Sequence, residues 1–213
     1  MGERADGPAA DTPRLPRLLV LRALGLGDLL AGVPALRALR REFRQYEIVL
    51  AAPPELAVPA ELSGAVDTLL PAAAPGRAVP RTLEWRGPPP EIAVDLHGSG
   101  PQSMEVLQRL RPRRLLAFAA PGGPEWYAEE HERDRWCRFL SWYGVPADPA
   151  DLRLPRPPGA SPAPGAVVLH PGAASPARCW PVERYAAVAA ELRRAGRHVV
   201  VTGGPREHEL LAG

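Results

Sequence analysis

Short apolar runs that alternate with helical patterns constrain the fold of this chain more than any other feature. Residues 18–21 form a continuous apolar run, as expected of a strand that is buried on both faces of a parallel sheet. A helical pattern, a strand at 48–51, a second helical piece and a strand at 67–70 follow in that order. This order predicts a doubly wound α/β domain with right-handed crossovers.

The alternation of strands and helices resumes after a proline-rich loop at 71–90. It completes the first domain and then, beyond a linker, predicts a second domain. Further strands are expected at 92–96, 114–118, 167–169 and 198–202, with helices at 102–110, at 129–143 and after Pro181. Residues 155–165 hold five prolines in eleven positions, which is typical of a semi-rigid linker. We therefore predict a disordered tail at 1–15, a first Rossmann-like domain at 16–154, the linker, and the start of a second Rossmann-like domain at 166–213. Two strands and little more than one helix cannot bury both faces of a sheet, so we expect the second domain to be truncated.

Composition excludes several classes of function. All 26 basic residues are arginine, which excludes chemistry that needs a Schiff-base or P-loop lysine. The formal net charge of +2 leaves no basic stripe, so nucleic acid is not an expected partner. The two cysteines, Cys137 and Cys179, lie far apart and fit a reducing compartment. No signal peptide and no apolar run of about 18 residues is visible, so the expected location is the cytoplasm.

Two familiar signatures are incomplete. The stretch GLGDLL at 25–30 begins like the dinucleotide fingerprint GxGxxG, but Leu30 stands where the third glycine belongs, which disfavours a nicotinamide or flavin site. His131 and Glu132 begin a zinc-binding HExxH, but Arg135 replaces the second histidine. We interpret residues 131–135 as a solvated helical face.

The stretch VVLHPGAASPARCWPVERY, residues 167–185, predicts a phosphate site. It reads as a strand, a loop of small residues and a helix N-terminus, where unpaired amides and the positive end of the helix dipole favour an anion. Arg178 adds a fixed positive charge, although a surface arginine packed near Trp180 is an equal alternative from local sequence. We expect a phosphate or diphosphate to bind here.

Asp28 is the strongest candidate for acid–base chemistry in the first domain. It follows the first strand, at the sheet edge where open α/β folds bind their ligands, so a general base is one interpretation. A helix N-cap is the other, and local sequence leaves both open. Asp95 and His97 end the strand at 92–96 and belong to the same edge.

Taken together, these motifs resemble a known family. The segment LLVLRALGLGDLLAGVPALRALRREF is similar to the N-terminal signature of glycosyltransferase family 9, the heptosyltransferase family. The segment VVLHPGAASPARCWPVERYAAVAAELRRAGRHVVVTGGPREHE is similar to the start of its second domain, and VDLHGS and GVPADPADLRLP fit between them. The resemblance covers roughly residues 16 to 213.

The resemblance implies a GT-B fold, with two Rossmann-like domains and a cleft between them that holds the acceptor and the nucleotide sugar. The implied activity is inverting transfer of a heptose-like sugar from a nucleoside-diphosphate sugar, such as ADP-heptose, to a hydroxyl of a glycan or glycolipid in cell-envelope biosynthesis. No resident cofactor and no metal is implied. Peripheral contact with the inner face of the membrane is compatible with such an acceptor.

The resemblance also assigns roles to positions. The family's catalytic aspartate falls on Asp28, and its diphosphate-contacting lysine falls on Arg178, a change that keeps the charge and alters the reach. The nucleotide and phosphate set comprises Gly172, Ala173, Ala174, Ser175, Gly203, Gly204 and, for the ribose, Glu207 or Glu209. The acceptor-side set comprises Gly25, Gly27, Asp95 and His97.

Two other functions remain open from the sequence alone. A non-catalytic nucleotide-binding fragment would need only the phosphate site, and a nucleotide-sugar epimerase could share the architecture. The products formed from a nucleotide sugar distinguish these alternatives from a glycosyltransferase.

Overall fold

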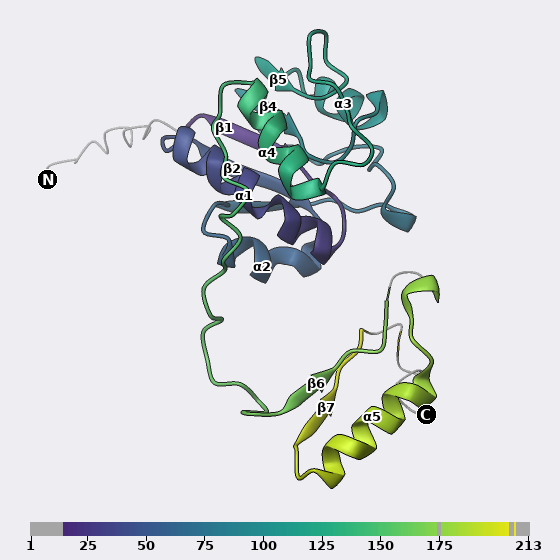
Figure 1. Cartoon of the computed structure of the whole chain (residues 1–213). Helices are drawn as coiled ribbons and strands as arrows, with labels where there is room; N and C mark the ends of the chain where they lie inside the picture. Colours follow the sequence, from purple (N-terminus) through teal and green to yellow (C-terminus); the bar gives the residue numbers. More distant parts are fainter. Residues whose placement is uncertain (1–14, 174–175, 205–206, 208–213) are drawn as a thin grey trace, which may run out of the picture. The chain divides into compact units, whose positions relative to one another are not determined.

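The computed structural model describes residues 15–173, 176–204 and 207, and the chain divides into two compact units. The first unit comprises Met1–Arg156 and the second Pro157–Gly213, so the division falls inside the proline-rich segment. Figure 1 shows the elements of each unit along the chain. Each unit is described by itself below.

The first unit is built on a five-stranded sheet in which all strands are parallel. The strand order is β3-β2-β1-β4-β5, so the chain starts in the centre and winds outward in both directions. This confirms the doubly wound α/β domain. The strands are β1 (Arg17–Leu21), β2 (Glu47–Ala52), β3 (Thr68–Pro71), β4 (Ile92–Asp95) and β5 (Arg114–Leu116).

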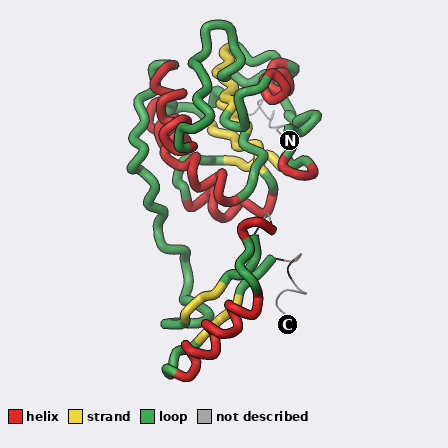
Figure 2. The backbone as a smooth tube through the Cα atoms, turned by 45° about the vertical axis from the view of Figure 1, so that its right-hand side comes forward, coloured by secondary structure: helices red, strands yellow, loops and turns green. Residues whose placement is uncertain are grey.

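Helices cover both faces of this sheet because the side chains of β1 are apolar on both sides. Leu18 and Val20 join one buried cluster with residues of α1 and α4, and Leu19 and Leu21 join a second one with residues of α3. Figure 2 shows the helices around the strands. The helices are α1 (Leu26–Glu42), α2 (Ala57–Leu62), α3 (Pro101–Gln108) and α4 (Glu132–Trp142), with short 3-10 turns η1 (Pro54–Leu56) and η2 (Pro75–Arg77).

The described part of the second unit contains one parallel strand pair and one α-helix. Its elements are β6 (Val167–Leu169), η3 (Pro176–Arg178), α5 (Val182–Arg194) and β7 (Val199–Val201). Val168 is 60% exposed and Val201 50% exposed, and no residue of α5 is buried. The described part of this unit therefore leaves apolar side chains in contact with water, as expected of a sheet with only two strands.

Among the residues that the structure describes, no helix combines the length and the apolar character needed to cross a lipid bilayer.

Candidate functional site

Asp28 lies in the first turn of α1, at the carboxyl edge of the sheet. The N-cap of this helix is Gly25, and Asp28 occupies the third helical position. Its Oδ2 accepts a hydrogen bond from the Gly25 N–H at 2.9 Å. The N-cap interpretation of Asp28 is therefore wrong in position, although the carboxylate does satisfy an unpaired amide at the helix start. About a quarter of its side chain (26%) remains exposed.

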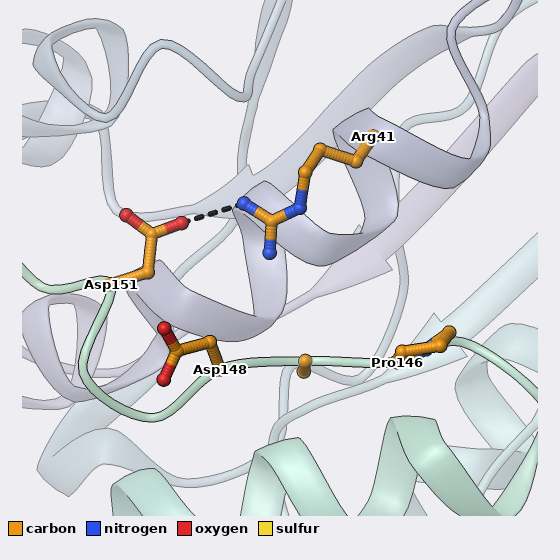
Figure 3. A pocket seen from close by; sticks show the side chains of 5 residues that line it. Arg41, Pro146, Asp148 and Asp151 are labelled. Carbon is orange, nitrogen blue, oxygen red and sulfur yellow. Dashed lines mark hydrogen bonds and ion pairs between the residues drawn. The ribbon is translucent and has the colours of Figure 1, made fainter.

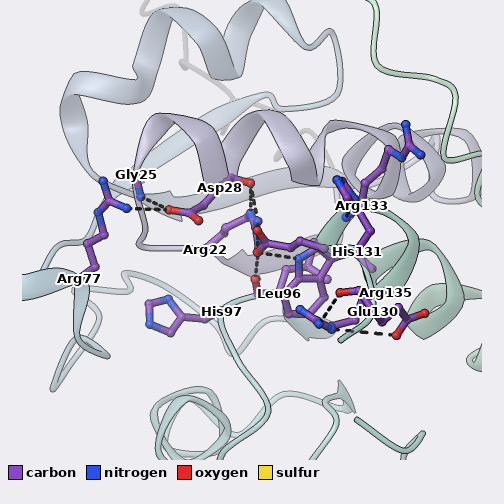
Figure 4. A network of polar contacts seen from close by, with 12 residues as sticks. Arg22, Gly25, Asp28, Arg77, Leu96, His97, Glu130, His131, Arg133 and Arg135 are labelled. Carbon is purple, nitrogen blue, oxygen red and sulfur yellow. Dashed lines mark hydrogen bonds and ion pairs between the residues drawn. The ribbon is translucent and has the colours of Figure 1, made fainter. Parts of the chain in front are cut away.

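Arg77 is a partner of Asp28 that the sequence analysis missed. Its Nη1 lies 3.5 Å from Asp28 Oδ2. Figure 4 shows the two side chains pointing toward each other. Arg77 has a positive φ of 62°, which is unfavourable for a residue with a Cβ. Its guanidinium lies against Gly25, where an added Cβ would come within 2.8 Å of Arg77 Nη2. The loop at 71–90, predicted only as a surface connection, thus supplies a cation beside the candidate base.

A fully buried arginine lies beneath Asp28. Arg22 is 0% exposed, and its Nε donates to the backbone carbonyl of Asp28 at 2.7 Å. Nη2 donates to the same carbonyl and to Glu132 Oε1 at 2.8 Å, and Nη1 donates to the Leu96 carbonyl. Burial lowers the pKa of Arg22, while the charge of Glu132 opposes that shift. One guanidinium thereby joins the start of α1, the loop after β4 and the start of α4 (Figure 4).

The interpretation of residues 131–135 as a solvated face is wrong at two positions. Glu132 pairs with Arg22, and Arg135 is buried. Arg135 Nη2 donates to the backbone carbonyls of Tyr127, Ala128 and Glu130, so it pins the loop before α4. Glu132 is half-buried and Arg135 is buried, and the partner of Glu132 is distant in sequence, so a local pattern does not reveal it.

The Arg22–Glu132 pair predicts a pH dependence of stability. Burial alone would raise the pKa of Glu132, but the charge and hydrogen bond of Arg22, together with the Trp136 N–H and the charge of Arg135, hold the pKa below the ordinary value of 4.5. A carboxylate with a lowered folded-state pKa stabilises the protein above its unfolded pKa, and this contribution is lost as the pH falls through the folded value. Glu132→Gln should therefore lower the free energy of unfolding at pH 7, and the difference from wild type should shrink below about pH 4.5 in urea denaturation series. An equal difference at pH 7 and pH 3 would contradict this interpretation.

Asp95 and His97 close the loop that follows β4. Asp95 is buried, and it accepts hydrogen bonds from Ser103 Oγ at 2.6 Å and from the His97 N–H at 3.0 Å. Burial raises the pKa of Asp95 to about 6. The His97 Nδ1 is buried and has no hydrogen-bond partner in the described part of the chain, and burial lowers the pKa of this imidazole, with a further contribution from Arg22. The buried Asp95 carboxylate thus joins the loop after β4 to the first turn of α3 through two hydrogen bonds.

In the second unit, the loops after β6 and β7 meet at one carboxylate. The Gly204 N–H donates to Glu207 Oε2 at 2.5 Å. An added Cβ on Gly172 would lie 1.9 Å from Glu207 Oε1. The structure thus brings together three residues of the predicted nucleotide set. Of the other members, Ala173 and Gly203 are exposed, whereas Ala174, Ser175 and Glu209 lie outside the described residues.

Gly172→Ala should test this arrangement. The new methyl group would displace the Glu207 carboxylate from its present position, so we expect weaker binding of a nucleoside diphosphate in calorimetry. A double-mutant cycle with Glu207→Ala identifies the cause. If the loss acts through Glu207, the double variant should bind no worse than Glu207→Ala alone, whereas additive losses would contradict that route.

Arg178 ends the 3-10 turn η3 and is exposed. The helix that follows has Pro181 as its N-cap. Arg184 lies over the ring of Trp180, with its Cζ 5.7 Å from the ring centroid. Arg178 therefore stands just before the start of α5, on an exposed part of the phosphate loop.

A surface pocket lies elsewhere on the first unit, as Figure 3 shows. Its lining comprises Arg41, Pro146, Ala147, Asp148 and Asp151. Arg41 lies near the far end of α1, roughly 20 Å along the helix from Asp28 at 1.5 Å per residue. Its Nη1 donates to Asp151 Oδ2 at 2.6 Å, so the cation there is already paired. We do not assign this pocket to the candidate site.

Part of the chain matches a known protein family. Residues 152–212 match the model of glycosyltransferase family 9 (heptosyltransferase). No curated protein was found to match the sequence. The matched segment contains η3, α5 and both strands of the second unit. The resemblance to this family is therefore confirmed over that segment.

Solved structures confirm the fold over most of the chain. A glycosyl transferase of family 9 from Veillonella parvula DSM 2008 matches with a TM-score of 0.70 and 18% identity, covering 93% of this chain and 65% of that one. The E. coli heptosyltransferase WaaC with ADP matches with a TM-score of 0.65 and 17% identity, covering 91% and 70%. E. coli ADP-heptose lps heptosyltransferase II matches with a TM-score of 0.59 and 18% identity, covering 91% and 66%. The chain thus spans about two thirds of their length, and the predicted GT-B type of α/β fold is confirmed.

Proposed function

We propose that this chain is an inverting glycosyltransferase that moves a heptose-like sugar from a nucleoside-diphosphate sugar to a hydroxyl of a glycan or glycolipid acceptor. The observation that carries the proposal is the family match at residues 152–212, because that segment holds Arg178, Gly172, Gly204 and Glu207. Two of the similar structures are named for ADP or ADP-heptose, which supports ADP-heptose as the donor to try first.

Asp28 is the general base of the proposed reaction. Its Oδ2 is held by the Gly25 N–H, so the carboxylate has a defined orientation while part of it stays accessible. The acceptor hydroxyl oxygen forms a bond to the anomeric carbon, the bond from that carbon to the diphosphate breaks, and Asp28 takes the hydroxyl proton. A single displacement of this kind inverts the anomeric configuration.

The second unit binds the leaving group. Arg178 offsets the charge that builds up on the departing diphosphate, and the backbone amides of the small-residue loop at 172–175 add donors. Glu207, fixed by the Gly204 N–H, can accept hydrogen bonds from ribose hydroxyls. These roles need neither a metal nor a resident cofactor.

Product analysis tests the proposal. The chain is incubated with ADP-heptose and a glycan or glycolipid acceptor, and the products are identified by mass spectrometry. We expect a new glycoside together with free ADP in equal amounts. An isomerised nucleotide sugar would instead indicate an epimerase. Nucleotide binding without any product, across a panel of donors and acceptors, would indicate a non-catalytic nucleotide-binding fragment.

A further inference from the structure

Arg22 holds the backbone of the residue that we propose as the base. Leaving the donors of a buried guanidinium without partners is costly, and the described partners of Arg22 come from three separate segments of the chain. Two of its nitrogens, Nε and Nη2, converge on one atom, the carbonyl oxygen of Asp28. Two nitrogens of one side chain therefore hold the backbone of Asp28.

Gly32 provides independent support for this contact. It lies inside α1 and is buried, and its φ is not positive, so the backbone does not require glycine there. Glycine weakens a helix interior relative to alanine. An added Cβ would lie 2.8 Å from Arg22 Nε and 3.1 Å from its Cδ. The missing side chain at Gly32 is therefore the space through which Arg22 reaches the Asp28 carbonyl.

We propose that Arg22 is a positioning residue for Asp28, an inference that rests on the proposed role of Asp28 as base. Arg22 fixes the backbone of Asp28, and the Gly25 N–H fixes the carboxylate. The ion pair with Glu132 and the bond to the Leu96 carbonyl anchor the guanidinium to α4 and to the loop after β4. Asp28 is thus restrained at its backbone carbonyl and at its carboxylate. The carboxylate therefore keeps one orientation at the edge of the sheet.

Two variants break this grip in different ways. Arg22→Met removes the guanidinium and keeps a long apolar side chain, whereas Gly32→Ala keeps every charge and displaces the guanidinium by steric contact. Both should lower kcat about 100-fold and leave the KM for the nucleotide sugar unchanged, because a small misplacement of a catalytic group costs that much. Arg22→Lys, which retains a charge and one donor group, should recover part of the loss.

Arg17 supplies the matched control. It lies at the other end of β1, and its Nη2 also donates to backbone carbonyls, those of Arg86 and Pro88. Arg17→Met and Arg17→Lys should therefore leave kcat and KM unchanged. Because Arg17 is only partly buried, this control reports the loss of an arginine that binds carbonyls away from Asp28, and exchange at Gly25 distinguishes positioning from general stability.

A second measurement separates this inference from the proposed function. The Gly25 amide, which donates to Asp28 Oδ2, can be followed by hydrogen exchange in the wild-type chain and in each variant. We expect faster exchange at Gly25 in Gly32→Ala and in Arg22→Met, with unchanged exchange in the central strands. Unchanged Gly25 exchange and unchanged kcat would overturn the inference. If the wild-type chain transfers no sugar, the proposed function fails, and Gly25 exchange alone then decides whether Arg22 positions Asp28.

Discussion

Asp28→Asn should lower kcat for sugar transfer by about 100- to 10,000-fold, the range that a general base contributes. An amide cannot take the proton of the acceptor hydroxyl. It can still accept the Gly25 N–H, so the start of α1 should remain intact. The affinity for the nucleotide, which we assign to the second unit, should not change. Steady-state kinetics and calorimetry with ADP measure the two effects separately.

Asp148 offers a matched control for this substitution. It is an exposed aspartate whose Oδ1 also accepts a backbone N–H, that of Ala150 at 2.9 Å. Asp148→Asn should transfer sugar at the wild-type rate. If Asp28→Asn also kept the wild-type rate, another group would have to take the proton and the assignment of the base would be wrong.

Arg178→Ala should weaken binding of the nucleoside diphosphate. A charge-assisted hydrogen bond from a guanidinium to a phosphate is stronger than a neutral one, but Arg178 is exposed and solvent weakens it. We therefore expect the affinity for ADP to fall about tenfold, which corresponds to about 1.4 kcal/mol. The loss should diminish at high salt, because ions screen exposed charges. Calorimetry at two salt concentrations measures both.

Arg194 is the control in the same unit. It lies at the other end of α5 and pairs with Glu191 on the surface. Its removal changes the net charge of the unit by the same amount, so Arg194→Ala should bind ADP like the wild type. Equal losses in the two variants would mean that Arg178 acts only through net charge and makes no specific contact with the diphosphate.

The fold of the first unit could be predicted because the residue pattern of its strands indicates whether each face of a strand is buried. The run at 18–21 is apolar at every position, and such runs occur where a parallel sheet is covered on both faces. The helix boundaries were less accurate. Helix α4 begins at Glu132 instead of 129, because the His131 side chain accepts the Arg133 N–H and caps the helix there.

The surroundings of Asp28 could be predicted only in part. Its place at the strand edge follows from the order of strand, glycine loop and helix, but its partners do not. Arg77 is 49 residues away in sequence and Glu132 is 110 residues away from Arg22, so no local spacing reveals them. Two signals were nevertheless present, namely an arginine directly after a buried strand and a glycine, Gly32, inside a helix.

The predicted nucleotide site could also be located in the sequence, but its contacts could not. The strand, loop and helix pattern at 167–185 predicted its loop, and the resemblance to the family suggested two glutamates without fixing the register. The contacts of Glu207 with Gly204 and beside Gly172 support the first of the two. The contacts of Glu207 could not be predicted from the sequence pattern, because they join loops that follow two different strands.

The anomeric configuration of the product tests the central claim most directly. The chain is supplied with ADP-heptose and an acceptor, and the new glycosidic bond is examined by NMR before and after substitution of Asp28 by asparagine. We predict a glycoside whose anomeric configuration is opposite to that of the donor, formed by the wild type and not detectably by Asp28→Asn. A product that keeps the donor configuration, or one that Asp28→Asn forms equally fast, would contradict direct displacement with Asp28 as base.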